Sequence, residues 1–118
     1  MVRVLLVDDE PFIVQGLKVM LEGQSVNCEV VGEASNGKEA LEFLKQREVD
    51  LVFADIKMPV MTGLELLETI RTEKISDAYF VILSGYSDFQ YAQQALRYDC
   101  MDYVLKPVKH EELERILE

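Results

Sequence analysis

Short apolar runs alternate with stretches of helical periodicity along this chain of 118 residues. Continuous apolar runs are typical of strands buried on both faces of a sheet. They occur at Val2–Val7, Glu29–Glu33, Leu51–Ala54, Phe80–Leu83 and Met101–Leu105. Elsewhere apolar residues recur three or four positions apart, as on one face of a helix. These sets are Ile13, Leu17, Met20 and Leu21; Ala40, Leu41 and Leu44; Leu64, Leu67 and Ile70; Tyr91, Ala95 and Leu96; and Leu113, Ile116 and Leu117.

The pattern predicts five strands alternating with five helices. Such alternation implies right-handed crossovers and a doubly wound α/β fold, in which helices cover both faces of a parallel sheet. Turn residues support the boundaries: Asn36-Gly37 precedes the second helix, Thr62-Gly63 opens the third, and Ser87-Asp88 can cap the fourth. Ligands of such sheets bind beyond the carboxyl ends of the strands, so we expect the functional residues there.

Composition and charge narrow the class of protein. The length fits one domain, and 49% apolar residues suffice for a core. The apolar N-terminal run reaches Asp8-Asp9-Glu10 too soon for a signal peptide or a membrane span, so we expect a cytoplasmic protein without membrane contact. The net charge of -10 argues against direct nucleic-acid binding and suits an Mg²⁺ site or a basic protein partner.

Several residues that often carry chemistry have a simpler structural interpretation here. Cys28 and Cys100 lie far apart in the sequence beside apolar residues, which predicts buried free thiols rather than a disulfide or a metal pair. His110, at the start of the acidic last helix, is predicted to be a surface residue rather than a phosphate carrier. Met58 and Met61 are predicted to pack in the core.

Acidic and phosphate-binding side chains stand where the predicted strands end. Asp8 and Asp9 follow the first strand, Asp55 the third, Ser84 ends the fourth, and Lys106 follows the fifth. The fold would bring all of them to one edge of the sheet. Carboxylates about 4 Å apart repel by about 4 kcal/mol per pair at an effective dielectric constant near 20. Three such groups therefore require a cation or shifted protonation.

The residue types at these positions favour phosphoryl chemistry. No His or Cys lies close to them in the sequence, so the ligands are oxygens, which favours Mg²⁺ or Mn²⁺ over Zn²⁺. Lys106 can offset the charge of a phosphoryl group, and the Ser84 hydroxyl can donate a hydrogen bond to it. Asp55 would then be the nucleophile that forms an acyl phosphate. Any one of these acids alone could equally be a helix cap.

Four segments, in this order and spacing, resemble the response-regulator receiver domains of two-component systems. They are Val7–Pro11, Asp55–Gly63, Leu83–Gly85 and Asp102–Pro107. The resemblance covers essentially the whole chain and implies a flavodoxin-like sheet of strand order 2-1-3-4-5. It also implies a switch that receives phosphate from a sensor histidine kinase and is not an enzyme, although it assists its own phosphorylation and dephosphorylation.

The resemblance assigns roles to the metal-binding residues. Asp9 and Asp55 would ligate Mg²⁺ directly together with the backbone carbonyl of Lys57, and Asp8 would contribute mainly through water. Asp55 would be the phosphorylation site. Lys57 and Tyr86, each two positions beyond a site residue, look placed to influence access of water or donor to the acyl phosphate.

The resemblance also assigns the residues that bind phosphate and transmit the signal. Lys106 would be the phosphate-binding lysine, followed by Pro107 in a cis peptide bond. Ser84 and Tyr103 look like the switch pair: Ser84 would move toward the new phosphate, and Tyr103 would rotate into the space that it leaves. Tyr103 as an ordinary tyrosine at the edge of the core stays an alternative.

Two other functions compete with a receiver. A metal-dependent phosphatase also uses an Asp nucleophile and Mg²⁺, but it needs a second acid and a substrate cap, and neither is evident in the sequence. A flavodoxin needs a phosphate-binding loop after the first strand, where Asp8-Asp9-Glu10 would repel the phosphate.

The last helix suggests a longer protein. We expect Glu111–Glu118 to end without a Gly, an Asn or a basic last turn, as though the chain were cut within a longer one. Ser84–Ala92 also resembles receivers that precede AraC-type helix-turn-helix domains. Residues 1–118 would then be the N-terminal receiver of a transcription regulator that contacts DNA only through a C-terminal domain. A single-domain regulator that docks to a partner, and a homodimer, stay open.

Overall fold

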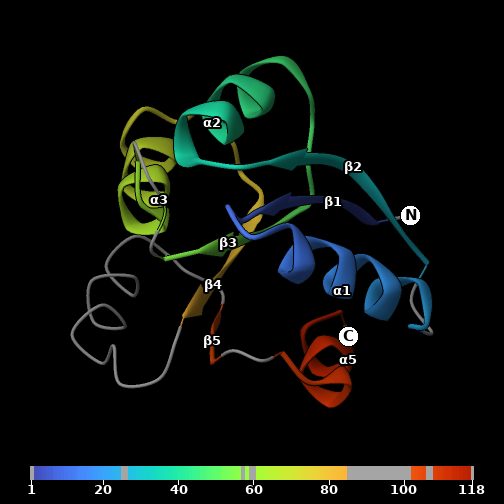
Figure 1. Ribbon diagram of the computed structural model, residues 1–118. Coiled ribbons are helices and arrows are strands. Elements are labelled where there is room, and N and C mark those ends of the chain that lie inside the picture. The colour runs from blue at the N-terminus through green and yellow to red at the C-terminus, as the bar shows by residue number, and fades with distance from the viewer. Residues whose placement is uncertain are drawn as a thin grey trace.

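One parallel sheet organises the computed structural model, which describes residues 2–24, 27–56, 58, 61–84, 102–105 and 108–117. The strand order within these residues is β2-β1-β3-β4-β5, and all neighbours are parallel (Figure 1). The strands are β1 (Val2–Val7), β2 (Cys28–Ala34), β3 (Leu51–Asp55), β4 (Tyr79–Ser84) and β5 (Asp102–Leu105). The described helices are α1 (Pro11–Glu22), α2 (Gly37–Gln46), α3 (Gly63–Thr72) and α5 (His110–Leu117).

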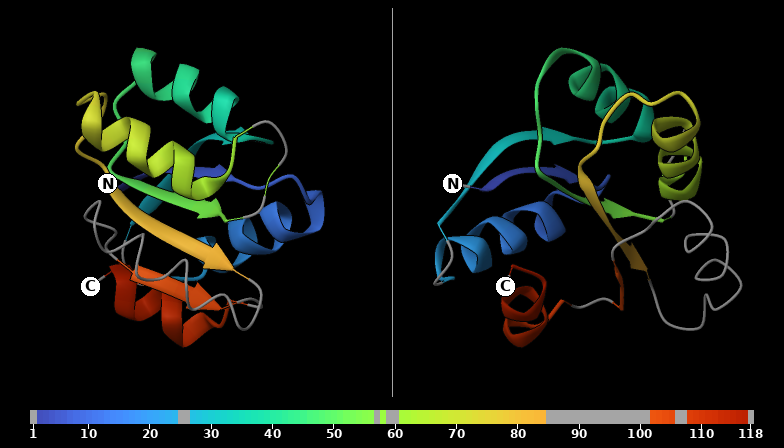
Figure 2. Two further views of the ribbon diagram at one scale, coloured as in Figure 1. Left: turned by 90° about the vertical axis from the view of Figure 1, so that its left-hand side faces the viewer. Right: turned by 180° about the vertical axis from the view of Figure 1, so that it is seen from behind.

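Helices cover both faces of the sheet, with α2 and α3 on one face and α1 and α5 on the other (Figures 1 and 2). Because successive side chains of a strand point to opposite faces, β3 contributes to two cores. Val52 and Ala54 pack on the side of α2 and α3, whereas Leu51 and Phe53 pack on the side of α1 and α5. The predicted parallel sheet between two helical layers is confirmed. The predicted fourth helix lies outside the described residues.

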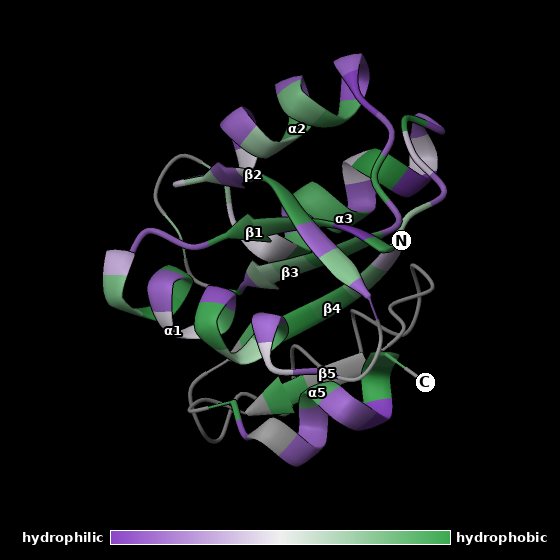
Figure 3. Cartoon of the chain, turned by 90° about the vertical axis from the view of Figure 1, so that its right-hand side faces the viewer, coloured by the Kyte–Doolittle hydropathy of each residue, from purple (hydrophilic) through white to green (hydrophobic). Residues whose placement is uncertain are grey.

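Hydropathy follows the layers. The inner strands β1, β3 and β4 are hydrophobic along most of their length, while hydrophilic residues recur along the helices and the segments that connect them (Figure 3). Phe53 and Phe80 are fully buried in the two cores. Burying a side chain of this size stabilises the fold by about 1.5–3 kcal/mol, so the sheet is a rigid base for residues at its edge.

Side-chain caps fix where two helices begin. Asn36 accepts a hydrogen bond from the Glu39 N–H of α2, and Thr62 and Glu65 form a reciprocal capping box at α3. Both predicted helix starts are confirmed. The capping side chains stabilise these starts because they accept hydrogen bonds from N–H groups that have no partner within the helix. The Ser87-Asp88 cap lies outside the described residues.

Two details of the sequence interpretation are wrong. The last turn of α5 does carry a basic residue, Arg115, which pairs with Glu112 at 2.9 Å and suits the negative end of the helix dipole. Cys28 is free as expected but only half-buried, because it begins β2 at the edge of the sheet. Partial burial raises the pKa of the Cys28 thiol.

Other expectations for single residues are met where the structure describes them. Met58 is buried in the core beside α2 and α3, and Met61 packs against that core. His110 begins α5, but its side chain lies outside the described residues, so its place at the surface stays a prediction, and Cys100 also lies outside them. Among the helices of the described part of the chain, none is long and apolar enough to span a membrane.

Candidate functional site

Four carboxylates meet at the carboxyl end of the sheet. They belong to Asp8, Asp9, Glu10 and Asp55, and one oxygen of each lies within 4.8 Å of the others. Asp8 and Asp55 are buried, with exposed fractions of 4% and 5%, whereas Asp9 and Glu10 are exposed. Two acids are thus set into the protein and two stand at its surface, which leaves the cluster open to solvent on one side.

The register of β1 and β3 brings the acids together. Val7 pairs with Ala54 in these neighbouring strands, so Asp8 and Asp55 are the next residue of each. The Asp8 N–H donates to the Ala34 carbonyl at 3.0 Å, and the Glu10 N–H donates to Asp8 Oδ1 at 2.9 Å. These bonds turn the chain sharply from β1 into α1 and hold the three consecutive acids near the edge.

The N-terminus of α1 adds a positive electrostatic potential near the acidic cluster. Glu10 is the residue before the helix and its side chain makes no cap, while Pro11 occupies the first helical position. The N–H groups of the first turn give this end of a helix a partial positive charge. That charge offsets part of the repulsion within the acidic cluster.

A close backbone contact joins the start of α3 to Asp55 and Ile56. The Gly63 N–H donates to the Ile56 carbonyl at 3.1 Å. A Cβ atom on Gly63 would lie 2.3 Å from the Asp55 carbonyl oxygen, so no other residue fits without displacing the backbone. The sequence interpretation of Gly63 as a turn residue missed this contact with Asp55.

The donor set fits a hard divalent cation. Carboxylate oxygens of octahedral Mg²⁺ lie about 2.0–2.1 Å from the ion, hence up to about 4.2 Å from one another. The 4.8 Å span of the four carboxylates requires only a small contraction to meet this geometry. At that span two carboxylates repel by about 3.5 kcal/mol at an effective dielectric constant near 20, which a bound cation would offset.

Of the residues predicted from the sequence, the structure brings Asp8, Asp9 and Asp55 together. Ser84 ends β4, next to Leu83, which pairs with Asp55. Tyr103 lies in β5 with its Cα opposite Ile82. The side chains of Ser84 and Tyr103, and the whole of Lys57, Tyr86, Lys106 and Pro107, lie outside the described residues.

Glu10 is the member of the cluster that the sequence interpretation gave no role. Its signal was present, because it directly follows Asp8-Asp9. Beside the cluster lies a hollow of about 250 Å³, lined among others by Asp8, Pro11, Gln15 and Glu39.

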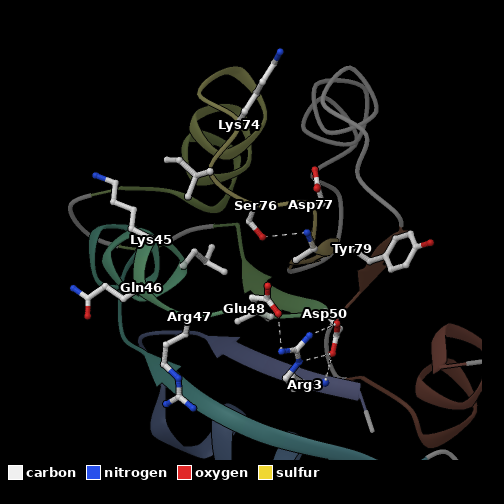
Figure 4. A pocket seen from close by; sticks show the side chains of 14 residues that line it. Arg3, Lys45, Gln46, Arg47, Glu48, Asp50, Lys74, Ser76, Asp77 and Tyr79 are labelled. Carbon is white, nitrogen blue, oxygen red and sulfur yellow. Dashed lines mark hydrogen bonds and ion pairs between the residues drawn. The ribbon is translucent and has the colours of Figure 1, made fainter.

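A second polar network lies at the opposite edge of the sheet, where the strands begin (Figure 4). Arg3 Nε donates to Asp50 Oδ2 at 3.0 Å and Arg3 Nη2 to Asp50 Oδ1 at 3.1 Å, while Arg3 Nη1 pairs with Glu48 at 3.1 Å. The adjoining groove has a volume of about 560 Å³, but the side chains of Lys45 and Lys74 extend away from the ion pairs (Figure 4). The network joins the starts of β1 and β3.

This network predicts a specific response to acid. The hydrogen bond from Arg3 lowers the pKa of Asp50 from 3.8 to about 2. A carboxyl whose pKa is lower in the folded state stabilises the protein above its unfolded pKa of about 4, and this contribution is lost as the pH falls toward the folded value. The difference in free energy of unfolding between wild type and Asp50→Asn should therefore be constant above pH about 5 and shrink toward pH about 2.

Urea unfolding at a series of pH values measures this difference. Comparing the two proteins cancels the titration of the acidic cluster, which both share. A difference that stays constant down to pH about 2 would contradict the role of the Arg3–Asp50 pair.

Comparisons with known proteins agree with the geometry. A family model described as "Response regulator receiver domain" matches residues 4–118. The chain is 36% identical over 118 residues to the uncharacterized transcriptional regulatory protein YesN of Bacillus subtilis, covering 100% of this chain and 32% of the relative. It is 38% identical over 117 residues to the transcriptional regulatory protein HptR of Staphylococcus aureus, covering 99% and 45%. The chain thus spans about a third to a half of the length of these relatives.

Solved structures give the same answer for the fold. The signal receiver domain of the putative response regulator NarL from Mycobacterium tuberculosis has a TM-score of 0.87 at 28% identity, covering 98% of this chain and 92% of that one. The receiver domain of AraT, a response regulator from Geobacillus stearothermophilus, has a TM-score of 0.82 at 37% identity, covering 99% and 91%. These likenesses confirm the flavodoxin-like receiver fold. The chain belongs to the response regulator receiver domains, the signalling modules of two-component systems.

Proposed function

We propose that this receiver is an Mg²⁺-dependent switch that accepts a phosphoryl group on Asp55 from a sensor histidine kinase and thereby controls transcription. The observation that carries the proposal is the cluster of four carboxylates at the carboxyl end of the sheet, with Asp55 buried within it. Within the described residues, no other group of at least three acidic, His or Cys side chains converges in this way.

Asp55 is better placed as the nucleophile than its neighbours. It is the last residue of a central strand, with β1 on one side and β4 on the other, and Gly63 closes on its carbonyl. Asp9 stands at the surface, and Asp8 and Asp9 both lie in the connection between β1 and α1 rather than in a strand. Rigid placement of a nucleophile lowers the entropic part of the barrier, which favours Asp55.

The transfer itself is a displacement at phosphorus. A carboxylate oxygen of Asp55 attacks, the new O–P bond forms, and the P–N bond of the donor phosphohistidine breaks with its electron pair returning to the imidazole nitrogen. The product is an acyl phosphate on Asp55. No oxidant or further reactant is needed.

Mg²⁺ would be held by Asp9, Asp55 and the backbone carbonyl of Lys57, with Asp8 acting mainly through water. When bound, the ion supplies positive charge to the carboxylates and to the phosphoryl oxygens. Glu10, which lies in the same cluster, would add negative charge at the exposed side. We propose that Asp9 and Asp55 contact the ion directly and that Asp55, at the end of β3, is also the nucleophile.

Lys106, Ser84 and Tyr103 complete the proposal. Ser84, the last residue of β4, pairs through its Cα with Leu105, the residue before Lys106, so the two phosphate-binding residues would lie at adjacent strand ends. Ser84 and Lys106 would hold the phosphoryl oxygens, and Tyr103 would report their presence along β5. The receiver would thus assist its own phosphorylation and dephosphorylation.

We propose that the output of the switch is carried by a DNA-binding domain that follows this receiver. The relatives YesN and HptR are transcriptional regulatory proteins of which the chain spans 32% and 45%. With a net charge of -10, the receiver itself is unsuited to phosphate backbones. A cytoplasmic location and a homodimer stay predictions.

Intact mass spectrometry after incubation with acetyl phosphate tests the proposal directly. We expect a gain of one phosphoryl group in the presence of Mg²⁺ and almost none after chelation with EDTA. Equal labelling with and without Mg²⁺ would contradict the assigned chemistry.

A further inference from the structure

Two described residues that follow Asp55, Gly63 and Met61, make close backbone contacts. The first residue is Gly63, whose N–H donates a hydrogen bond to the Ile56 carbonyl and whose Cα lies close to the Asp55 carbonyl. The second residue is Met61, whose backbone carbonyl accepts a hydrogen bond from the Gly37 N–H at 3.3 Å. The second contact joins Met61 to the first residue of α2, an element to which the proposed chemistry assigns no role.

The Gly37 contact has no room for a side chain. A Cβ atom on Gly37 would lie 2.7 Å from Met61 Cγ and 2.8 Å from both Met61 Cβ and the Met61 carbonyl oxygen. These distances are shorter than carbon and oxygen atoms tolerate, and one partner is backbone. A methyl group at position 37 would therefore push Met61 away from α2.

The segment that ends at Gly37 also supports the other side of the acidic cluster. Its first residue, Ala34, accepts the N–H of Asp8 at 3.0 Å. Between them, Ser35 donates from its N–H and hydroxyl to the Glu39 carboxylate at 3.0 and 3.1 Å, which fixes the turn to α2. Four residues thus connect Asp8 with the loop that follows Asp55.

We infer that Gly37 is a positioning residue for the acidic site: by letting Met61 lie directly against α2, it sets the spacing between the Asp8 side and the Asp55 loop that cation binding requires. The inference rests on the proposed function, because it concerns the Mg²⁺ affinity of that site. Residues that orient metal ligands from outside the first coordination shell typically change metal affinity by about 10–100-fold when they are replaced.

A matched pair of glycine substitutions separates positioning from general destabilisation. Gly32→Ala is the control, because its Cβ would lie 2.5 Å from the Phe43 ring, in an equally tight contact that also involves α2 but joins it to β2. Both variants should lose stability to thermal unfolding. Only Gly37→Ala touches the loop after Asp55.

The experiment is an NMR titration of each protein with MgCl2 at constant ionic strength, following the backbone amides of Asp8 and Asp55. We expect the Mg²⁺ dissociation constant of Gly37→Ala to rise by about 10–100-fold, and that of Gly32→Ala to stay within about twofold of wild type. Met61→Ala keeps the backbone bond to Gly37 and removes the packing, so a smaller rise of roughly threefold to tenfold is expected.

A folded Gly37→Ala protein that binds Mg²⁺ as wild type does would overturn the inference and leave the proposed function intact. The inference would also be overturned if the Mg²⁺ dissociation constant of Gly32→Ala rose as much as that of Gly37→Ala. If Gly37→Ala does not fold, Met61→Ala decides in its place, with unchanged affinity as the contrary result. A wild-type protein that shows no Mg²⁺-dependent shift would overturn the proposed function together with the inference.

Discussion

Asp55→Asn is expected to abolish phosphorylation by acetyl phosphate or a histidine kinase, because an amide nitrogen or oxygen at this position is too weak a nucleophile for phosphorus. The substitution keeps the size of the side chain and removes one charge from a crowded cluster. The fold should therefore persist. Loss of labelling would then report the missing carboxylate alone, measured as the intact mass over time.

Asp50→Asn is the matched control, because Asp50 directly precedes the strand that Asp55 ends. It makes the same chemical change at the opposite edge of the sheet, within the ion pair with Arg3. We expect it to be labelled at the wild-type rate. Full labelling of Asp55→Asn, or failure of Asp50→Asn to be labelled although folded, would contradict Asp55 as the acceptor.

The second large effect is a reversal of relative stability by Mg²⁺. Without metal, Asp9→Asn should unfold at a higher temperature than wild type, because it removes repulsion with carboxylates within 4.8 Å. Asp9 is exposed, so solvent reduces this gain to about 1 kcal/mol or less. With saturating Mg²⁺ the order should invert, since the variant binds the ion more weakly and gains less from it.

Thermal unfolding at increasing MgCl2 measures both effects in one series. At a ligand concentration about 100 times the dissociation constant, binding to the native state adds about 2.7 kcal/mol of stability. Each tenfold loss of affinity in Asp9→Asn removes about 1.4 kcal/mol of that gain. If the unfolding temperatures of wild type and Asp9→Asn rise by the same amount at every Mg²⁺ concentration, Asp9 is not a ligand.

Asp77→Asn serves as the control for charge. Asp77 is an exposed acid between α3 and β4, beside the groove at the opposite edge of the sheet. Its replacement changes the net charge by the same amount as Asp9→Asn. We expect its Mg²⁺ response to equal that of wild type, which would separate ligation from a general electrostatic effect.

Much of the site could be predicted from the sequence, because the fold could be predicted from it. A parallel sheet brings the carboxyl ends of all its strands to one edge, so residues after each apolar run share a neighbourhood whatever their separation in sequence. Asp8, Asp9 and Asp55 are close for this reason. Glu10 joins them because the turn into α1 is tight, which depends on the hydrogen bond from Glu10 to Asp8.

The sequence by itself determined the local structure. Apolar runs fixed the strands, and the short-range bonding of Asn36 and Thr62 fixed the starts of α2 and α3, because a cap involves only residues three positions away. It also determined the acidic character of the strand ends.

Only the tertiary structure decided which backbone segments approach each other closely. Three such contacts follow from the spacing of the packed layers. They are Gly63 against Asp55, Gly37 against Met61, and Arg3 with Asp50, which are 47 positions apart. The half-exposure of Cys28 likewise follows from the place of β2 at the edge of the sheet. Such contacts have no local pattern, because they depend on interior packing in which every neighbour contributes to the distance.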